Sequence, residues 1–184
     1  MDILNSKFTL GIEEEYLLID KETRDLASEP PEDLLNDCTK ALGDHVTPEF
    51  LRCQIEVGTP VCTSIAEARE QLSHLRCTIA EIAAGYELAP LAVSTHPFAT
   101  WSAQHHTKKE RYDTLVKDLH MVARRMPICG MHVHVGSEDQ NRRNAIFNQL
   151  PYFMPHRLAP STCSPFWPGM VAGLESYRQW VFDE

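Results

Sequence analysis

The segment from residue 8 to residue 20, FTLGIEEEYLLID, is an apolar stretch interrupted by three consecutive glutamates. Its β-branched and aromatic residues, followed by the polar turn KETRD, predict a β-strand. Because side chains alternate between the two faces of a strand, Glu13 and Glu15 share one face and Glu14 takes the other. Two carboxylates on one face repel each other and are costly to bury without a counter-charge. The segment is therefore either a solvated acidic edge strand or a strand that binds a divalent cation.

The rest of the chain predicts further strands and several helices. Strands are expected at 49–57, 88–94 and 128–135, and helices at 32–42, 65–84, 108–125 and 138–150, the last broken or kinked at Pro151; a loop is expected from Ala159. Ser64 and Glu67 form a capping box at the start of the helix at 65–84, Gly85 follows the end of that helix, and Gly43 follows the end of the helix at 32–42. Strands and helices do not alternate strictly, so we expect an α+β class with an antiparallel or mixed sheet, helices packed on one face, and a single domain over residues 1–184.

Composition limits which molecules the chain is expected to bind and in which cellular compartment it is expected to lie. The chain has 17 basic and 26 acidic residues and a formal net charge of -9, which disfavours nucleic acid as a partner but allows ATP where divalent cations bridge carboxylates to phosphates. The absence of a long apolar run or an apolar leader predicts no membrane span and a cytoplasmic location. Six cysteines without a CxxC pair predict reduced, mostly buried thiols rather than a zinc ribbon or disulfide framework.

Two further places carry polar residues in apolar surroundings. Glu56 follows apolar neighbours in the strand expected at 49–57, and Glu49 begins the same segment, so either carboxylate needs a cation or a partner such as Arg52. His132 and His134 share one face of the strand expected at 128–135. Such a pair can ligate zinc or iron, or can line a cleft through hydrogen bonds.

Several strings, taken in their order along the chain, resemble the carboxylate–amine ligase family related to glutamate–cysteine ligase type 2. They are LGIEEEY at 10–16, the segment from Glu49 through QIE to TPVC at 59–62, THPF at 95–98, ERY at 110–112, GMHVHVG at 130–136, SPFW at 164–167, and Gly173 with SYR at 176–178. Each string is common by itself, and their shared order over nearly the whole chain carries the resemblance.

The resemblance implies a glutamine-synthetase-like catalytic sheet whose concave face holds metal, nucleotide and substrate. It implies ATP and Mg²⁺ as cofactors, His132 and Arg178 as catalytic residues, and nucleotide binding through Glu13, Glu15, Glu56 and His132. The metal ligands that it implies are Glu13, Glu15, Glu49, Glu56 and His132.

The implied reaction is amide formation through an acyl phosphate, joining a glutamate-like carboxylate to a small amine such as cysteine. Family members are longer, so we expect this chain to be the N-terminal half of the catalytic domain, truncated at the C-terminus, with an open sheet edge that favours a homodimer. Residues 169–173 also read GMVAG where the family has Gly-x-Asp-Thr-Gly. Two alternatives stay open: an inactive remnant that binds metal or a partner subunit, and a metal-dependent hydrolase that uses His132 and His134.

Overall fold

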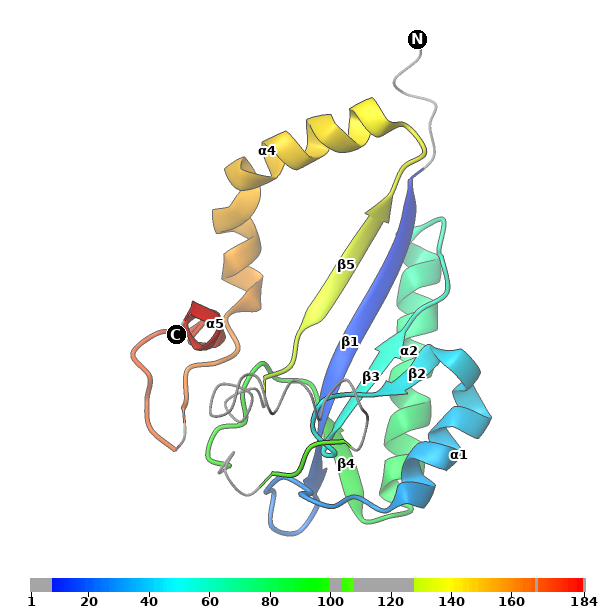
Figure 1. Cartoon of the computed structure of the whole chain (residues 1–184), viewed down its shortest axis with the longest axis vertical. Helices are drawn as coiled ribbons and strands as arrows, with labels where there is room; N and C mark the ends of the chain where they lie inside the picture. Colours follow the sequence, from blue (N-terminus) through cyan, green and yellow to red (C-terminus); the bar gives the residue numbers. More distant parts are fainter. Residues whose placement is uncertain (1–7, 100–103, 108–127, 168, 184) are drawn as a thin grey trace.

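A long central strand, β1 (Thr9–Asp20), organises the sheet of this chain. The structure is a computed structural model, and it describes residues 8–99, 104–107, 128–167 and 169–183. Within these residues the sheet has five strands, and each strand pairing is antiparallel. The other strands are β2 (Val46–Pro48), β3 (Gln54–Gly58), β4 (Leu88–Leu91) and β5 (Met131–Gly136). β3 lies along one side of β1, whereas β5 and β4 follow each other along its opposite side (Figure 1).

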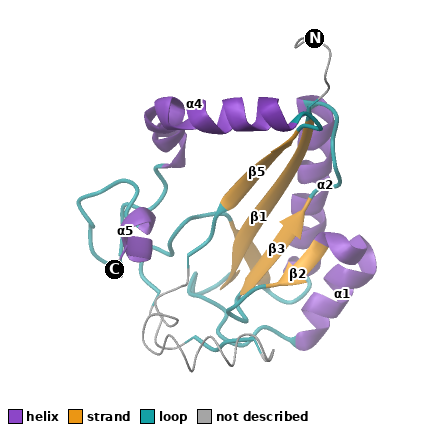
Figure 2. Cartoon of the chain, turned by 45° about the horizontal axis from the view of Figure 1, so that its top comes forward, coloured by secondary structure: helices purple, strands orange, loops and turns teal. Residues whose placement is uncertain are grey.

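Two helices, α1 (Glu32–Leu42) and α2 (Ile65–Ala84), pack on one face of the sheet (Figure 2). α2 begins as the sequence predicts, because Ser64 Oγ accepts a hydrogen bond from the Glu67 amide at 3.1 Å. The Glu67 carboxylate reaches back one residue further than expected, to the Thr63 amide at 2.7 Å. The core between helices and sheet is apolar and buried, and it includes Tyr16, Leu18, Leu34, Cys38, Ile55, Val57, Leu75 and Ile79. This arrangement confirms the expected α+β class.

The opposite face of the sheet has a smaller apolar cluster at one end. Leu17 and Ile19 of β1 contact Phe50, Leu51 and Cys53 there. The alternation of β1 therefore places its apolar residues in two separate cores, one on each face. Loops, rather than α1 and α2, cover this second face, and they leave its acidic residues accessible.

Some sequence-based boundaries were wrong. The strand expected at 49–57 is a hairpin: β2 and β3 are separate strands, and residues 49–53 form the turn between them. Pro48 has no N–H to continue the ladder, and the Gln54 amide closes the turn on the Leu51 carbonyl at 3.0 Å. The predicted helix at 108–125 lies outside the described residues. The strand expected at 88–94 ends at Leu91.

The helix expected at 138–150 is longer than predicted, because α4 spans Gln140–Leu158 and contains Pro151 and Pro155. Figure 1 shows that α4 bends along its length, as the missing proline N–H groups favour. Beyond it, the predicted loop holds two short helices, η4 (Ala159–Ser161) and α5 (Arg178–Asp183). Within the described residues, no helix is long and apolar enough to cross a membrane.

Candidate functional site

Strand register brings the predicted acidic residues onto one face. Glu15 of β1 stands opposite Glu56 of β3, and Glu13 stands opposite His132 of β5. Cross-strand partners point to the same face of a sheet, so these four side chains share one face. That face is turned away from α1 and α2, because the intervening Glu14 points toward the helices.

Glu13 lies between the two histidines of β5. Its Oε2 atom is 3.4 Å from Nδ1 of His132 and 3.1 Å from Nε2 of His134. All three side chains are half exposed, so solvent and small ions can reach them. Both imidazole rings therefore lie beside the Glu13 carboxylate.

Burial raises the pKa of Glu15 and of Glu56 above their ordinary values, and repulsion from neighbouring carboxylates raises both further. Glu49, in the turn between β2 and β3, adds negative charge to both sites. The Gly130 amide donates to Glu15 Oε2 at 2.9 Å, and Thr47 donates to Glu56 Oε1 at 3.2 Å. Both hydrogen bonds favour the ionised form, so they oppose the increase in pKa. The carboxylates are thus held in place on a face where their charge is incompletely balanced.

The donor set fits Mg²⁺ in its chemistry. Mg²⁺ prefers oxygen ligands and is commonly held by one or two carboxylates together with waters and substrate phosphates. Among the residues that the structure describes, no three acidic, histidine or cysteine side chains form a group that could hold a metal by themselves. A site completed by phosphate and water needs no such group. A three-ligand zinc site does need one, so the described residues give no support to the hydrolase that would use His132 and His134.

A cavity of about 390 Å³ adjoins the acidic face at Glu15 and Gly130. Arg178 lies in its wall, close enough to β5 that a Cβ at position 130 would be 2.9 Å from its Nη2 atom. The glycine at this position therefore leaves room for the guanidinium. The backbone amide of Arg178 donates to Ser164 Oγ at 3.0 Å, which joins α5 to the loop before it.

Serine hydroxyl groups also line this cavity, and they were not predicted from the sequence as site residues. Ser94, Ser161, Ser164 and Ser176 line it, together with the thiol of Cys163, whose Sγ atom is 2.7 Å from Ser94 Oγ. Ser176 Oγ is buried and has no hydrogen-bond partner within the described part of the chain. These residues come from loops that are distant in the sequence and meet in the folded chain. In the sequence, only the SPFW and SYR strings pointed to any of them, namely Ser164 and Ser176.

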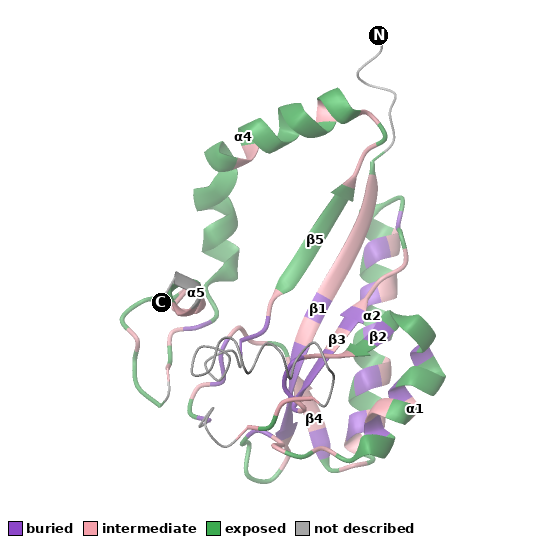
Figure 3. Ribbon diagram, in the orientation of Figure 1, coloured by how far each residue is buried: buried purple, intermediate pink, exposed green. Residues whose placement is uncertain are grey.

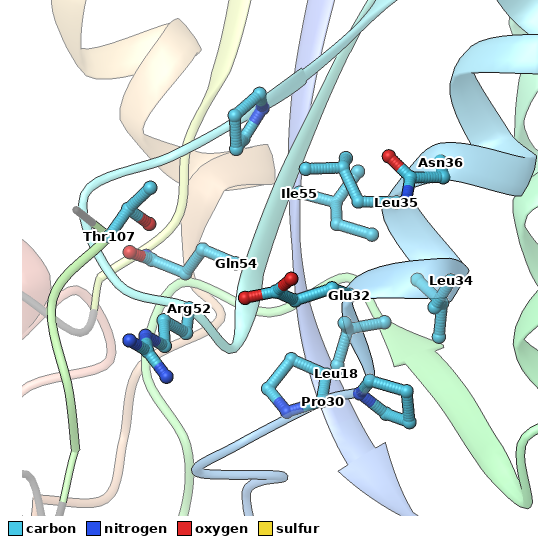
Figure 4. Close-up of a pocket in the computed structure, with 12 residues that line it drawn as sticks. Leu18, Pro30, Glu32, Leu34, Leu35, Asn36, Arg52, Gln54, Ile55 and Thr107 are labelled. Atoms are coloured by element: carbon cyan, nitrogen blue, oxygen red, sulfur yellow. The ribbon is translucent and has the colours of Figure 1, made fainter. Parts of the chain in front are cut away.

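A second cavity, of about 310 Å³, opens on the helix side of the sheet between α1 and the β2–β3 hairpin (Figure 4). Leu18 and Leu34 form part of its wall, and Arg52 lies at its rim. Arg52 is 3.5 Å from Glu29, so the structure does not pair it with Glu49 or Glu56 as one sequence interpretation suggested. This cavity includes none of Glu13, Glu15, Glu49 and Glu56, and it is separate from the candidate site.

A family model described as glutamate–cysteine ligase family 2 matches residues 9–184. The chain belongs to this family. Members named "Putative glutamate--cysteine ligase 2" include one from Rhodospirillum rubrum, 58% identical over 179 residues that make up 95% of this chain and 46% of the relative. Another, from Jannaschia sp., is 58% identical over 176 residues, 96% of this chain and 46% of the relative. The chain thus spans about half the length of these curated relatives.

Two solved structures resemble this family member in fold. A glutamate–cysteine ligase from Francisella tularensis, solved in complex with AMP, superposes with a TM-score of 0.59 at 17% identity, covering 82% of this chain and 31% of that one. A bifunctional glutathione synthetase from Pasteurella multocida gives 0.56 at 13% identity, covering 77% of this chain and 19% of that one. At these identities the likeness concerns the fold, and it agrees with the antiparallel sheet and helices expected from the sequence.

The segment in which this family member departs from the expected Gly-x-Asp-Thr-Gly pattern is a tight turn. Gly169 and Gly173 have φ angles of 76° and 77°, a region that favours glycine. Trp167 donates its amide to the Met170 carbonyl at 2.9 Å, which closes the turn. Val171, at the position of the expected acid, is exposed. The turn geometry is therefore compatible with the pattern, while the polar side chains are absent.

Proposed function

We propose that this chain supplies the metal- and phosphate-binding part of an ATP-dependent carboxylate–amine ligase that forms a γ-glutamyl-cysteine-type amide. The observation that carries the proposal is the gathering of Glu13, Glu15, Glu56 and His132 on one accessible sheet face, next to a cavity that contains Arg178. Family membership supports the same class of reaction. In this proposal residues 1–184 form the N-terminal portion of a longer catalytic domain.

The reaction requires neutralisation of charge on a phosphate while a carboxylate attacks it and forms an acyl phosphate, from which the amine displaces phosphate. Mg²⁺, when bound, would supply most of that neutralisation. One or two of the ionised carboxylates of Glu13, Glu15 and Glu56, together with phosphate oxygens and water, would hold it, with Glu49 adding negative charge at the edge of the site. The Gly130 amide and the Thr47 hydroxyl keep Glu15 and Glu56 in fixed orientations. His132, beside Glu13, would donate a hydrogen bond to a phosphate oxygen.

Arg178 would bind the carboxylate of the glutamate-like substrate. A guanidinium offers paired donors that match a carboxylate, and the serine hydroxyls of the same cavity offer further hydrogen bonds. The cavity opens beside Glu15, so a carboxylate bound there would lie near phosphate held at the acidic face.

A second candidate is binding without turnover. It is favoured by one observation: Val171 and Ala172 stand where the Gly-x-Asp-Thr-Gly pattern has an acid and a hydroxyl, so two polar side chains of that pattern are absent. Release of ADP from ATP in the presence of glutamate and cysteine would support the ligase, whereas Mg²⁺-dependent ATP binding without ADP release would support this alternative.

Calorimetric titration of ATP with and without Mg²⁺ tests the phosphate site itself. The double substitution Glu13→Gln and Glu15→Gln should weaken Mg²⁺-dependent ATP affinity by about tenfold or more, as losses around metal sites commonly do. Glu22→Gln, in the exposed turn after β1, is the matched control and should leave affinity unchanged. Equal Mg²⁺-dependent affinity in the double variant and the parent chain would refute the proposed site.

A further inference from the structure

Gln54, the first residue of β3, is a buried polar residue to which the proposed reaction assigns no role. Only 4% of its surface is exposed. Because side chains alternate along a strand, Gln54 lies on the same face of the sheet as Glu56. A buried amide group is costly unless its N–H and its C=O both find hydrogen-bond partners. The partners of Gln54 therefore show which parts of the fold it joins.

The amide nitrogen of Gln54 holds the segment that leads into β5. Its Nε2 atom donates to the Ile128 carbonyl at 3.0 Å and contacts Cys129 Sγ at 3.5 Å. Figure 3 shows that this segment is buried and that the chain becomes exposed where it enters β5. The next residue, Gly130, donates its amide to Glu15 Oε2, and its carbonyl accepts a hydrogen bond from the Glu15 amide at 3.1 Å. Gln54 thus holds the backbone just before the amide that orients Glu15.

The amide oxygen of Gln54 holds the turn between β2 and β3. Its Oε1 atom accepts a hydrogen bond from the Leu51 amide at 3.3 Å, and its backbone amide donates to the Leu51 carbonyl at 3.0 Å. Glu49 lies in the same turn, where its carboxylate accepts a hydrogen bond from the Phe50 amide at 2.8 Å. One side chain therefore joins the turn that carries Glu49 to the segment that orients Glu15.

We propose that Gln54 is a positioning residue for the acidic face, which fixes the Gly130 amide and the turn of Glu49 relative to each other. This role rests on the proposed function, because it assumes that the acidic face holds Mg²⁺. Hydrogen bonds around metal ligands orient those ligands, and losing them commonly weakens metal binding by about tenfold to a hundredfold. Gln54 acts in this way through its neighbours, without touching the cation.

A neutral amide suits this position better than a charged side chain. An amide offers both donors and acceptors, so it satisfies a backbone C=O and a backbone N–H at once. Lysine or arginine would offer donors only, and their positive charge would neutralise the carboxylates that are to hold a cation. A carboxylate would offer acceptors only and would add to the repulsion that Glu49 already exerts on Glu15 and Glu56.

The test replaces Gln54 with methionine in the full chain. Methionine has a similar length but lacks the donor and the acceptor of the amide. The Gly130 amide should then exchange with solvent about tenfold faster, which corresponds to the loss of one hydrogen bond. NMR spectra of chain labelled isotopically at glycine alone measure this rate, because only eight glycines contribute signals. Calorimetric titration should show Mg²⁺-dependent ATP affinity about tenfold weaker than in the parent chain.

Ile79→Val is the matched control for a loss of stability by itself. Ile79 is fully buried in α2 and packs on the opposite face of the sheet, and the variant removes one buried methylene. It should lower the melting temperature and leave both the Gly130 exchange rate and the ATP affinity unchanged. Gln54→Asn, whose amide is too short to span both partners, should show the same two changes and replaces Gln54→Met if that variant does not fold.

Faster exchange at Gly130 together with weaker Mg²⁺-dependent ATP affinity, in a variant that circular dichroism shows to be folded, would support the proposal. Unchanged exchange at Gly130 would overturn it. Faster exchange with ATP affinity equal to that of the parent chain would also overturn it, because Gln54 would then have a structural role only. A parent chain without Mg²⁺-dependent ATP affinity would refute the proposed function, and the exchange rate alone would then decide whether Gln54 fixes the Gly130 amide.

Discussion

Adjacent glutamates on β1 have different electrostatic environments because they point to opposite faces. Glu14 is only 5% exposed, and the Arg76 guanidinium and the Tyr16 hydroxyl both donate hydrogen bonds to its carboxylate. That carboxylate raises the pKa of Arg76 and, together with burial, that of Tyr16. Glu15, one residue later, faces other acids and has a raised pKa. One glutamate therefore stabilises the fold, whereas its neighbour carries uncompensated charge that a ligand can relieve.

Arg76 forms an ion pair with the buried Glu14 carboxylate. Arg76→Met should lower the free energy of unfolding by about 3 kcal/mol, since removing one partner leaves a buried carboxylate unpaired. The value is at the lower end of the usual range because half of the Arg76 side chain is exposed, which admits water to the carboxylate. Urea denaturation monitored by circular dichroism measures the change.

Arg69→Met is the control for this substitution, since Arg69 lies on the exposed side of the same helix. It should change the free energy of unfolding by less than about 0.5 kcal/mol. Similar midpoints for Arg76→Met and Arg69→Met would show that the pair with Glu14 contributes little to stability.

At the scale of elements, two glycines that follow helices differ in what they require. Gly43, after α1, has φ 61° and ψ -134°, a backbone conformation that side chains oppose. Gly85, after α2, has φ -67° and ψ -16°, which any residue adopts. The sequence predicted both as helix ends, but it could not show that only Gly43 depends on being glycine.

Gly43→Ala should therefore destabilise the chain by about 1–2 kcal/mol through backbone strain, with no steric clash, because nothing lies within 4 Å of the added Cβ. Gly85→Ala is the comparison, and we expect a change of less than about 0.5 kcal/mol. Thermal unfolding of both variants under identical conditions measures the difference. A Gly43→Ala variant as stable as Gly85→Ala would contradict the assigned backbone conformation.

Local signals in the sequence predicted elements well where one pattern dominated. The stripe and capping box of α2 gave the helix that the structure shows, and the alternation in β1 placed Glu13 and Glu15 on one face. The hairpin at 46–58 was missed because Phe50 and Leu51, which read as strand residues, are buried by tertiary contacts in a turn. The pairing of Glu15 with Glu56 depends on register between distant strands, which a single sequence does not encode locally.

At the scale of the whole molecule, the carboxylates of Glu13, Glu15 and Glu56 share the sheet face that is turned away from α1 and α2. Because the raised pKa values of Glu15 and Glu56 apply to the folded state, that state binds protons more tightly than the unfolded chain. The stability that protonation provides is present at low pH and is lost as pH rises through the raised folded-state values. Near neutral pH the folded chain therefore retains unfavourable repulsion on this face.

A bound divalent cation relieves the same repulsion as protonation, so the two effects compete. We expect Mg²⁺ to raise the melting temperature by about 3 °C near pH 7, as ligands of the native state do, and by clearly less near pH 5, where protons compete for the carboxylates. Differential scanning calorimetry with NaCl at equal ionic strength separates binding from screening. The double variant Glu13→Gln and Glu15→Gln should lose the Mg²⁺ effect, while Glu22→Gln should keep it. An increase equal to that in NaCl, or one that persists unchanged near pH 5, would show that this face screens its charge without a specific cation site.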